Sequence, residues 1–409
     1  MKIGIDVSTV LNFGIKVGSG RYIINLVDSL LSLEDNRVSQ EIEKTTSRTR
    51  TNQKKVKDNN TFIFTGRYFN NENLHLFKEL KDKYPKLDIK YRFFASSEEK
   101  IKKWDDRNFP PLEFKGFKSD ILHCPDYLIP PTLNKNIILT IHDLSFFRFP
   151  QFNFDWFIKK YQKVTLENTK RAKIIIADSY STKNDIMKFM GIEDSKIHVV
   201  YLAPDKKFRI LDKNEINLST LEKYGINKNF ILSVGTIEPR KNFKTLIRAF
   251  DLFKEKNKIA KTYKLVIVGK TGWKSEETFE AYNNSKNKKD IIFTGEIPDD
   301  DLLQLYNCAS LFVYPTIFEG FGLPILEAMA CGIPVIASNT SSIPEILNHD
   351  NLLFNPFDEN EISRKINNIL STPHLREEIR DLCIKEVSKF SWQKTALDTF
   401  RVYNLCFNK

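Results

Sequence analysis

The chain has 409 residues, of which 41% are hydrophobic and 28% charged; this is an ordinary globular composition and excludes a disordered chain. At about 100–200 residues per domain, the length predicts two domains, each large enough to bury its own core. The formal net charge of +11 favours anionic partners such as nucleic acid, anionic lipid or phosphorylated small molecules, and a compositional bias toward Lys, Asn and Ile explains it equally well.

Short apolar runs alternate with amphipathic stretches along the whole chain. Continuous apolar runs are typical of parallel strands that are covered on both faces. In the first half we expect strands at residues 2–5, 61–64, 89–93, 121–123, 137–141, 174–177 and 198–200. In the second half we expect them at residues 230–234, 264–268, 291–294, 311–314, 335–337 and 352–354. A helix with Asn242 as N-cap is expected over residues 242–253.

This alternation predicts an α/β fold with two Rossmann-like, doubly wound domains that face each other across a cleft. A polar stretch at residues 204–229 interrupts the strand series, so we place the domains at residues 1–205 and 206–388. Residues 36–60 contain seven Lys or Arg, three Asp or Glu and almost no large apolar side chain. Such a segment cannot contribute to a core, and we expect a flexible insertion there.

The strongest motif is Glu-Gly-Phe-Gly-Leu-Pro-Ile-Leu-Glu at residues 319–327, between the expected strand 311–314 and a helix-like stretch. Its glycines let the backbone approach a ligand, and its proline suits a first helical turn. Free N–H groups at such a helix start favour an anion such as a diphosphate. Glu319 and Glu327 can accept hydrogen bonds from sugar and ribose hydroxyls. The alternative is a structural turn with Glu327 near the positive end of the helix dipole.

Two further turns carry candidate binding residues. Arg240 and Lys241 follow Gly235 after the expected strand 230–234, and adjacent cations at a strand-to-helix turn can neutralise a leaving diphosphate. Gly18 and Gly20 precede a helical run, in a turn that is equally well an ordinary βα connection. The full G-x-G-x-x-G pattern is absent, which argues against a dinucleotide oxidoreductase.

His142 directly follows the expected strand 137–141, where a side chain would face the cleft; a purely structural histidine explains it as well. His123 has a similar position. The triplet Asp299-Asp300-Asp301 is similar to a D-x-D metal motif, but it follows a proline and precedes two leucines, which favours a helix start. We expect no metal site. The aromatic and lysine-rich segment 146–163 is either domain core or a surface that docks a lipid-linked acceptor or a membrane.

Residues 319–327 resemble the E-x7-E motif of the family 4 retaining glycosyltransferases, which have the GT-B fold. The sequences at 314–316 and 327–338 match that family as well, and Phe-Ser-Trp at 390–392 resembles its C-terminal segment. The resemblance covers nearly the whole chain and is greatest to bacterial mannosyltransferases of lipopolysaccharide and capsule assembly. It implies an acceptor-side domain over residues 1–205, a donor-binding domain over 206–388 and a final helix over 389–409 that packs on the N-terminal domain.

The resemblance also implies roles for the residues of the cleft. Glu319, His142, Arg240 and Lys241 would be catalytic. Many relatives have Arg where this chain has Thr236, which leaves the division of labour between Arg240 and Lys241 open. The donor would contact Gly18, Gly20, Gly235, Arg240, Lys241, Glu319, Gly320, Phe321, Gly322, Leu323 and Glu327.

The implied reaction moves a hexose, with mannose favoured, from a nucleotide diphosphate sugar to a glycan or lipid-linked acceptor during cell-surface polysaccharide synthesis. No cofactor is expected beyond the substrate itself, for which GDP-mannose leads over UDP and dTDP sugars, and no specific nucleic-acid partner is expected. A non-catalytic sugar-nucleotide-binding protein, a phosphorylase and an epimerase are the alternatives. Five cysteines without a C-x-x-C pair and the absence of a signal-like start favour the cytoplasm, with peripheral contact to an anionic membrane left open.

Overall fold

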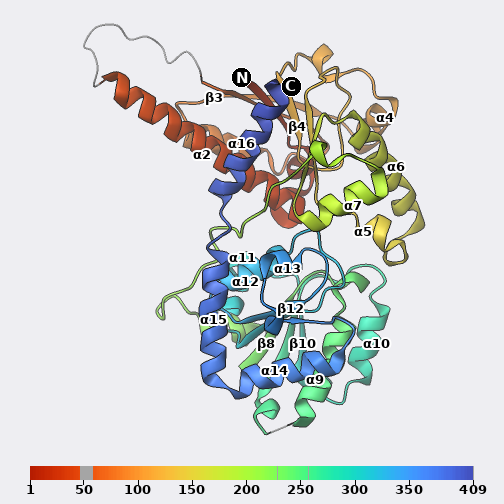
Figure 1. Cartoon of the computed structure of the whole chain (residues 1–409), viewed down its shortest axis with the longest axis vertical. Coiled ribbons are helices and arrows are strands. Elements are labelled where there is room, and N and C mark those ends of the chain that lie inside the picture. The colour runs from red at the N-terminus through yellow and green to blue at the C-terminus, as the bar shows by residue number, and fades with distance from the viewer. Residues whose placement is uncertain (47–58, 228, 257, 409) are drawn as a thin grey trace.

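The computed structural model describes residues 1–46, 59–227, 229–256 and 258–408, which form two α/β domains stacked along the long axis (Figure 1). The N-terminal domain has a seven-stranded sheet in the order β3-β2-β1-β4-β5-β6-β7, and the C-terminal domain has a six-stranded sheet in the order β10-β9-β8-β11-β12-β13. Neighbouring strands pair in parallel throughout both sheets. This confirms the predicted fold of two doubly wound domains.

Each expected strand forms, with small shifts at the ends. The first sheet contains β1 (Lys2–Asp6), β2 (Thr61–Tyr68), β3 (Asp88–Ala95), β4 (Ile121–Cys124), β5 (Ile137–Ile141), β6 (Ile174–Ala177) and β7 (Ile197–Val199). The second contains β8 (Asn229–Val234), β9 (Tyr263–Val268), β10 (Ile291–Gly295), β11 (Leu311–Tyr314), β12 (Val335–Ser338) and β13 (Leu353–Phe354). Every residue of β5 and of β11 is buried, as expected of parallel strands with helices on both faces.

Helices connect the strands and cover both faces of each sheet. Those of the N-terminal domain are α1 (Ser8–Phe13), α2 (Gly18–Thr46), α3 (Leu74–Lys83), α4 (Glu98–Arg107), α5 (Ser145–Arg148), α6 (Asp155–Arg171) and α7 (Tyr180–Met190). The later ones are α8 (Leu218–Lys223), α9 (Phe243–Lys256), α10 (Glu276–Asn284), α11 (Asp299–Cys308), α12 (Leu323–Ala330), α13 (Ile343–Ile346), α14 (Glu359–Ser371), α15 (Pro373–Val387) and α16 (Trp392–Asn408).

Helix α2 corrects the expectation of a loop from residue 36, because it continues to Thr46. Val38 is buried on this part of the helix, so the segment does contribute to the core. Glu34 accepts from the Arg37 guanidinium at 2.6 Å and from the backbone N–H of Asn60 at 2.9 Å, which ties the helix to the start of β2. The remainder of the expected insertion, residues 47–58, lies outside the described part of the chain.

Helix α9 forms where its apolar spacing predicted it, but Asn242 does not cap it in the expected way. The apolar residues Phe243, Leu246 and Phe250 are all buried. The Asn242 side-chain amide donates to the carbonyl oxygens of Pro315 and Pro356 at 3.1 and 2.7 Å, and its backbone φ is +56°. Asn242 therefore ties the Arg240–Lys241 turn to the loops after β11 and β13.

The C-terminal helix α16 returns to the N-terminal domain and packs beside α2, β4 and β5 (Figure 1). The Tyr403 hydroxyl lies 2.8 Å from Nδ1 of His123, and Lys173 Nζ donates to the carbonyl oxygen of Cys406 at 2.9 Å. In the described part of the chain, no helix combines the length and apolar content that crossing a membrane requires.

Candidate active site

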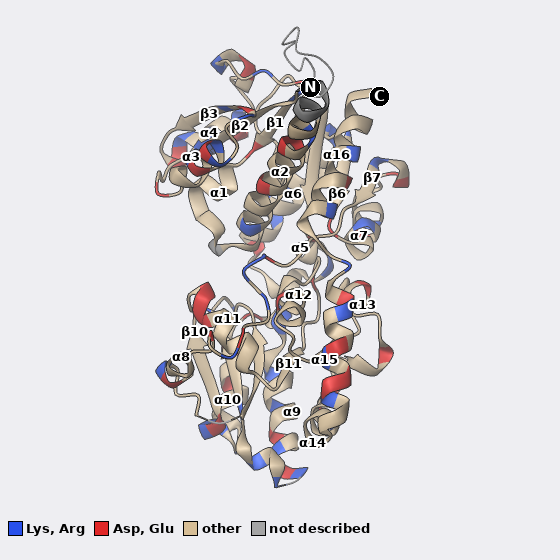
Figure 2. Cartoon of the chain, turned by 90° about the vertical axis from the view of Figure 1, so that its left-hand side faces the viewer, with Lys and Arg blue, Asp and Glu red and all other residues tan. Residues whose placement is uncertain are grey.

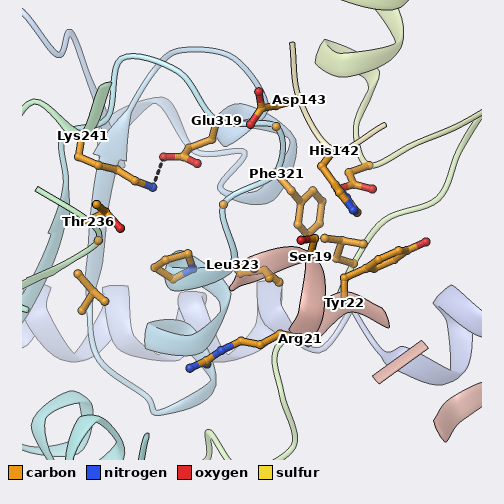
Figure 3. Close-up of a pocket in the computed structure, with 18 of the residues that line it drawn as sticks. Ser19, Arg21, Tyr22, His142, Asp143, Thr236, Lys241, Glu319, Phe321 and Leu323 are labelled. Atoms are coloured by element: carbon orange, nitrogen blue, oxygen red, sulfur yellow. Dashed lines mark hydrogen bonds and ion pairs between the residues drawn. The ribbon is translucent and has the colours of Figure 1, made fainter. Parts of the chain in front are cut away.

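A cleft of about 480 Å³ lies between the carboxyl ends of the two sheets, where the loops of the two domains meet. Figure 2 shows basic and acidic segments side by side in this region. All but one of the residues expected to bind donor or act in catalysis line the cleft: Gly18, His142, Gly235, Arg240, Lys241, Glu319, Gly320, Phe321, Gly322, Leu323 and Glu327. In Figure 3, Lys241 and Glu319 occupy one side and His142 and Tyr22 the other.

Glu319 is the centre of a hydrogen-bond network on the C-terminal side of the cleft. Its Oε1 accepts from Lys241 Nζ at 2.6 Å, from the Thr316 hydroxyl at 2.9 Å and from the Tyr314 hydroxyl at 3.0 Å. Its Oε2 accepts from Arg240 at 2.9 Å. The β8–α9 turn, which carries both cations, is thereby fixed to the loop after β11.

Burial alone would raise the pKa of Glu319, but the charges of Arg240 and Lys241 together with these hydrogen bonds lower it to about 2. Burial opposes the charge of Arg240 as well, yet Glu319 and Glu238 together raise the pKa of its guanidinium. Glu238 accepts from Arg240 at 2.8 Å. Glu319 and Arg240 are therefore both ionised at neutral pH.

The second acid of the motif, Glu327, lies within α12 and behaves differently. Its Oε2 accepts from the Tyr306 hydroxyl at 3.1 Å, and its Oε1 lies 3.6 Å from Arg21 of the opposite domain. Burial raises the pKa of Glu327 to about 7, because Arg21 and Tyr306 offset only part of the desolvation. Glu327 is thus partly protonated near neutral pH.

Helix α12 begins at Leu323, directly after Gly322, whose φ is +120°. That backbone conformation favours glycine. Pro324 occupies the first turn, where an N–H has no intrahelical partner in any case. The positive end of the helix faces the cleft beside Glu319 and His142, and such a terminus attracts anions.

His142 lies on the N-terminal side and makes two hydrogen bonds to acceptors. Its Nδ1 is 2.7 Å from Asp178 Oδ2, and its Nε2 is 3.1 Å from the carbonyl oxygen of Pro125. A carboxylate and a carbonyl can only accept, so both ring nitrogens carry hydrogen. Burial opposes the imidazolium, but Asp178 outweighs it and raises the pKa of His142 to about 9. His142 is therefore a fixed positive charge rather than a free base.

Gly320 marks a close contact between the domains. A Cβ atom added to Gly320 would lie 1.9 Å from the carbonyl oxygen of His142 and 2.8 Å from the Cβ of Asp143. The Ser179 hydroxyl, at the start of α7, donates to the Gly320 carbonyl at 2.6 Å. Only glycine allows the Glu319 loop to approach the end of β5 this closely.

We expect Gly320→Ala to push the domains apart and to lower stability by about 1–3 kcal/mol, the usual effect of overpacking. Thermal unfolding measures the loss. Gly18→Ala is the control, because nothing lies within 4 Å of its added methyl group. Equal midpoints for the two variants would contradict the proposed contact.

Gly20 is the predicted donor residue that the structure places elsewhere. Its added Cβ would lie 2.0 Å from the carbonyl oxygen of Gly14, so Gly20 packs from the first turn of α2 against the preceding turn and is not among the residues that line the cleft. His123 is also away from the lining. Its two nitrogens bond the hydroxyls of Tyr403 and Thr140 at 2.8 Å, and burial lowers its pKa to about 3. Both residues support the fold around the site.

The acids at residues 299–301 form the first turn of α11, as expected, and Pro298 occupies the N-cap position. Asp299 pairs with Arg21 and, at 2.6 Å, with Lys207, while Asp301 pairs with Lys223 at 2.7 Å. Over the described ranges, no group of three or more His, Cys, Asp or Glu side chains is arranged to hold a metal ion.

Several residues that sequence reasoning missed also line the cleft, among them Ser19, Arg21, Tyr22, Asp143 and Asp178. Asp178 directly follows β6 and Asp143 is the second residue after β5, so their position at a carboxyl strand end was a usable signal. Arg21 lies on α2 and reaches across the domain boundary to Asp299 and Glu327, which no sequence pattern indicates.

A second cavity of about 590 Å³ continues the cleft toward β9 and β10. It shares Arg21, Gly235 and Thr236 with the first cavity and adds Lys270 and Glu296. The two cavities together offer one continuous site, with Arg21 among the residues that they share.

Known protein families match both halves of the chain. The family described as "Glycosyl transferases group 1" matches residues 220–384, and the one described as "Glycosyltransferase Family 4" matches residues 72–207. The O-antigen chain mannosyltransferase B of Escherichia coli is 31% identical over 292 residues, 71% of this chain and 76% of the relative. The O-antigen chain mannosyltransferase RfbU of Salmonella typhimurium is 32% identical over 260 residues, 63% of this chain and 67% of the relative.

Solved structures share the fold over nearly the full length. Anabaena Alr3699/HepE in complex with UDP-glucose has a TM-score of 0.69 at 16% identity and covers 99% of each chain. WaaG, a glycosyltransferase involved in lipopolysaccharide biosynthesis, has a TM-score of 0.67 at 12% identity and covers 97% of this chain and 98% of its own. Both family matches and the relatives above 30% identity agree: the chain belongs to the family 4, group 1 glycosyltransferases and has the GT-B fold.

Proposed function

We propose that this glycosyltransferase moves mannose from GDP-mannose to a hydroxyl of a glycan or lipid-linked acceptor in cell-surface polysaccharide synthesis, with retention of the anomeric configuration. The transfer from a nucleotide sugar follows from membership of the family. The named relatives, both O-antigen mannosyltransferases, favour mannose. The observation that carries the proposal is the cluster of Glu319, Arg240 and Lys241 facing the N-terminus of α12.

In this proposal Arg240 and Lys241 bind the diphosphate and offset the charge that develops on it as the glycosidic bond breaks. The N-terminus of α12 adds backbone N–H donors to the same phosphates. Both cations are paired with Glu319, so a bound diphosphate has to share them with that carboxylate. Glu327 would accept hydrogen bonds from the ribose hydroxyls, and the base would extend into the second cavity beside Glu296.

Glu319 is a poor nucleophile and a poor base, because each of its oxygens is already hydrogen-bonded and its pKa is about 2. It suits instead the acceptance of hydrogen bonds from hydroxyls of the transferred sugar. His142 is equally unsuited to take a proton, since both of its nitrogens donate. We therefore infer a front-face transfer in which the leaving phosphate accepts the proton of the attacking hydroxyl. Closure of the cleft would exclude water and limit hydrolysis.

We further propose that residues 1–205 form the acceptor-side domain, that residues 206–388 form the donor-binding domain, and that residues 389–409 couple the two. Arg21 supports this division, because it reaches from the first domain to Asp299 and Glu327 in the second. A bound donor would then be enclosed by residues of both domains.

A thermal-unfolding panel of GDP, UDP, dTDP, ADP and their common sugar conjugates tests the donor. A ligand that binds only the folded state stabilises it by about 2.7 kcal/mol at a hundredfold excess over its Kd. We expect GDP and GDP-mannose to raise the midpoint and the other nucleotides to leave it unchanged. The anomeric configuration of the product, read by NMR, tests retention. No shift with any nucleotide at millimolar concentration would contradict the transferase assignment, and binding without turnover would favour a non-catalytic sugar-nucleotide-binding protein.

A further inference from the structure

A further cavity of about 480 Å³ lies at the domain boundary, next to the cleft but separate from it. Among the described residues, none lines both spaces. The Ser179 hydroxyl, which donates to the Gly320 carbonyl, marks the division, because Asp178 before it lines the cleft and Tyr180 after it lines the cavity. We call this space the side cavity and define it by Arg148, Phe149, Tyr180, Asn184, Phe318 and Phe357.

The charged side chains that line the side cavity are neutralised by partners within the protein. Helices α7 and α13 face each other here across the domain boundary (Figures 1 and 2), and Glu345 on α13 accepts from the backbone N–H groups of residues 180 and 181 at 2.8 Å each. Glu345 also accepts from the Tyr201 hydroxyl at 2.9 Å. Arg148 makes two hydrogen bonds to the buried Asp185, one of them 3.1 Å long. An anionic ligand therefore finds neither a spare cation among the described lining residues nor a vacant start of α7.

The uncharged polar groups of the side cavity are available to a ligand. In the part of the chain that the structure describes, the hydroxyls of Tyr180 and Ser181 and the amide of Asn184 make no hydrogen bond. Tyr180 and Asn184 are four residues apart on α7 and so share one helix face. An apolar ligand such as an acyl chain would cover these groups without satisfying them, at about 1–3 kcal/mol each. They favour a ligand that carries hydroxyls of its own.

Aromatic rings from both domains line the same space. Tyr180 on α7 is 57% exposed, and Phe357 in the loop after β13 is 67% exposed. The ring centroids of Phe149 and Phe318 lie 5.7 Å apart, so these two side chains form a continuous part of the wall. A sugar ring has an apolar C–H face that packs on an aromatic ring, while the hydroxyls at its edge bind polar side chains. Exposed rings beside unpartnered hydroxyl and amide groups suit this combination.

The side cavity also touches the segment that carries Glu319. Ser341 lines the cavity, and its hydroxyl accepts from the backbone N–H of Glu319 at 2.9 Å. The backbone φ of Ser341 is +52°, a conformation that residues other than glycine adopt rarely. An occupant of the side cavity would therefore contact both domains and a residue that supports Glu319.

We propose that the side cavity binds a neutral saccharide, and that this saccharide is the part of the glycan acceptor beyond the residue that receives the transferred sugar. Internally paired charges, available hydroxyl and amide groups and exposed rings together fit a neutral ligand with many hydroxyls. A chain held at this second site would have its end at a raised local concentration near the cleft. The identity of the saccharide as acceptor rests on the proposed function, whereas saccharide binding itself does not.

Calorimetry of the full chain with mannotriose, with and without saturating GDP, tests the site. We expect saturable binding in both conditions, because the side cavity is separate from the cleft. Phe357→Ser and Asn184→Ala alter the cavity from opposite domains, and each should weaken binding about 5–10-fold. Phe114→Ser is the matched control, at a ring that is 68% exposed and outside the side cavity, and should leave the affinity within twofold.

Transfer kinetics test the acceptor role. The ratio of kcat/KM for mannotriose to kcat/KM for methyl α-mannoside should fall about 5–10-fold in Phe357→Ser and stay unchanged in Phe114→Ser. Both acceptors use the same donor site, so a general loss of folded protein would not move this ratio. Unchanged thermal midpoints show that the variants fold.

A wild type that binds no mannotriose, with or without GDP, overturns the proposal, as does an equal loss in Phe357→Ser and Phe114→Ser. A dimer that Phe357→Ser dissociates, in a protein that binds no saccharide, would identify the side cavity as an interface between copies and would equally overturn it. Mannotriose binding that Phe357→Ser weakens, without transfer to either acceptor, would contradict the proposed function and support the saccharide site.

Discussion

Replacing Lys241 by methionine should lower the rate of sugar transfer by about 10²–10³-fold, the usual effect of removing one charge-stabilising donor from an active site. Lys241 Nζ lies 2.6 Å from Glu319 and 2.8 Å from the Tyr314 hydroxyl, within the cleft and beside α12. Methionine keeps most of the volume and removes the charge. Steady-state kinetics with the donor found by the nucleotide panel measure the loss, and the midpoint shift caused by the nucleotide should shrink as well.

The matched control is Lys244→Met, three positions along the chain. Lys244 pairs with Glu277 on α10 and not with any residue of the cleft. We expect this variant to keep wild-type kinetics. Glu319 stays paired with Arg240 in Lys241→Met, so the fold should survive the change. Activity within a few-fold of the wild type would show that Arg240 alone binds the phosphates and would remove Lys241 from the proposed mechanism.

Much of the fold follows from the sequence, because parallel strands are encoded locally. The run Ile-Ile-Leu-Thr-Ile of β5 is apolar at nearly every position and is buried at every position. Helix α2 shows where local reasoning fails. Charge suggested a loop from residue 36, but Val38 and Glu34 find partners in tertiary structure, and the helix continues to Thr46. Contacts between distant segments outweighed composition there.

The candidate site also divides into features that the local sequence encodes and features that depend on tertiary contacts. The residues of the Glu319–Glu327 motif were predictable because they form one continuous segment at a strand-to-helix turn. The place of Asp178 at the end of β6 was a usable signal, but its role was not predictable, since that role depends on a contact of 2.7 Å with His142 on a neighbouring strand end. A glycine needed for backbone packing, as Gly20 is against the carbonyl oxygen of Gly14, cannot be told without coordinates from one needed for ligand approach. Charge states are hidden for a similar reason: the two acids of the motif differ in pKa only through their burial and partners.

The second large effect is a pH dependence of folding stability that comes from Glu327. Replacing Glu327 by glutamine should remove it. The pKa of Glu327 is raised from its ordinary 4.5 to about 7, so the folded protein binds this proton more tightly than the unfolded chain. Without a ligand, the contribution of Glu327 to the free energy of unfolding therefore falls as pH rises from 4.5 to about 7, and it is not regained at higher pH. Glu327→Gln avoids ionisation and should be more stable than the wild type at pH 8 by up to about 3 kcal/mol. Thermal unfolding at pH 5 and pH 8 measures the difference, which should be small at pH 5.

Nucleotide affinity should rise with pH, whereas the stability of the protein without nucleotide falls. Ribose hydroxyls donate best to an ionised carboxylate, so wild-type affinity should rise about tenfold between pH 6 and pH 8 as Glu327 loses its proton. The diphosphate also gains charge in this range, and the ratio of wild-type to Glu327→Gln affinity, measured by calorimetry at each pH, isolates the contribution of the carboxylate. A constant ratio would mean that Glu327 does not contact the nucleotide. A rising ratio in a variant that is more stable when empty would show that the buried carboxylate is kept for binding, at a cost to stability that the ligand offsets.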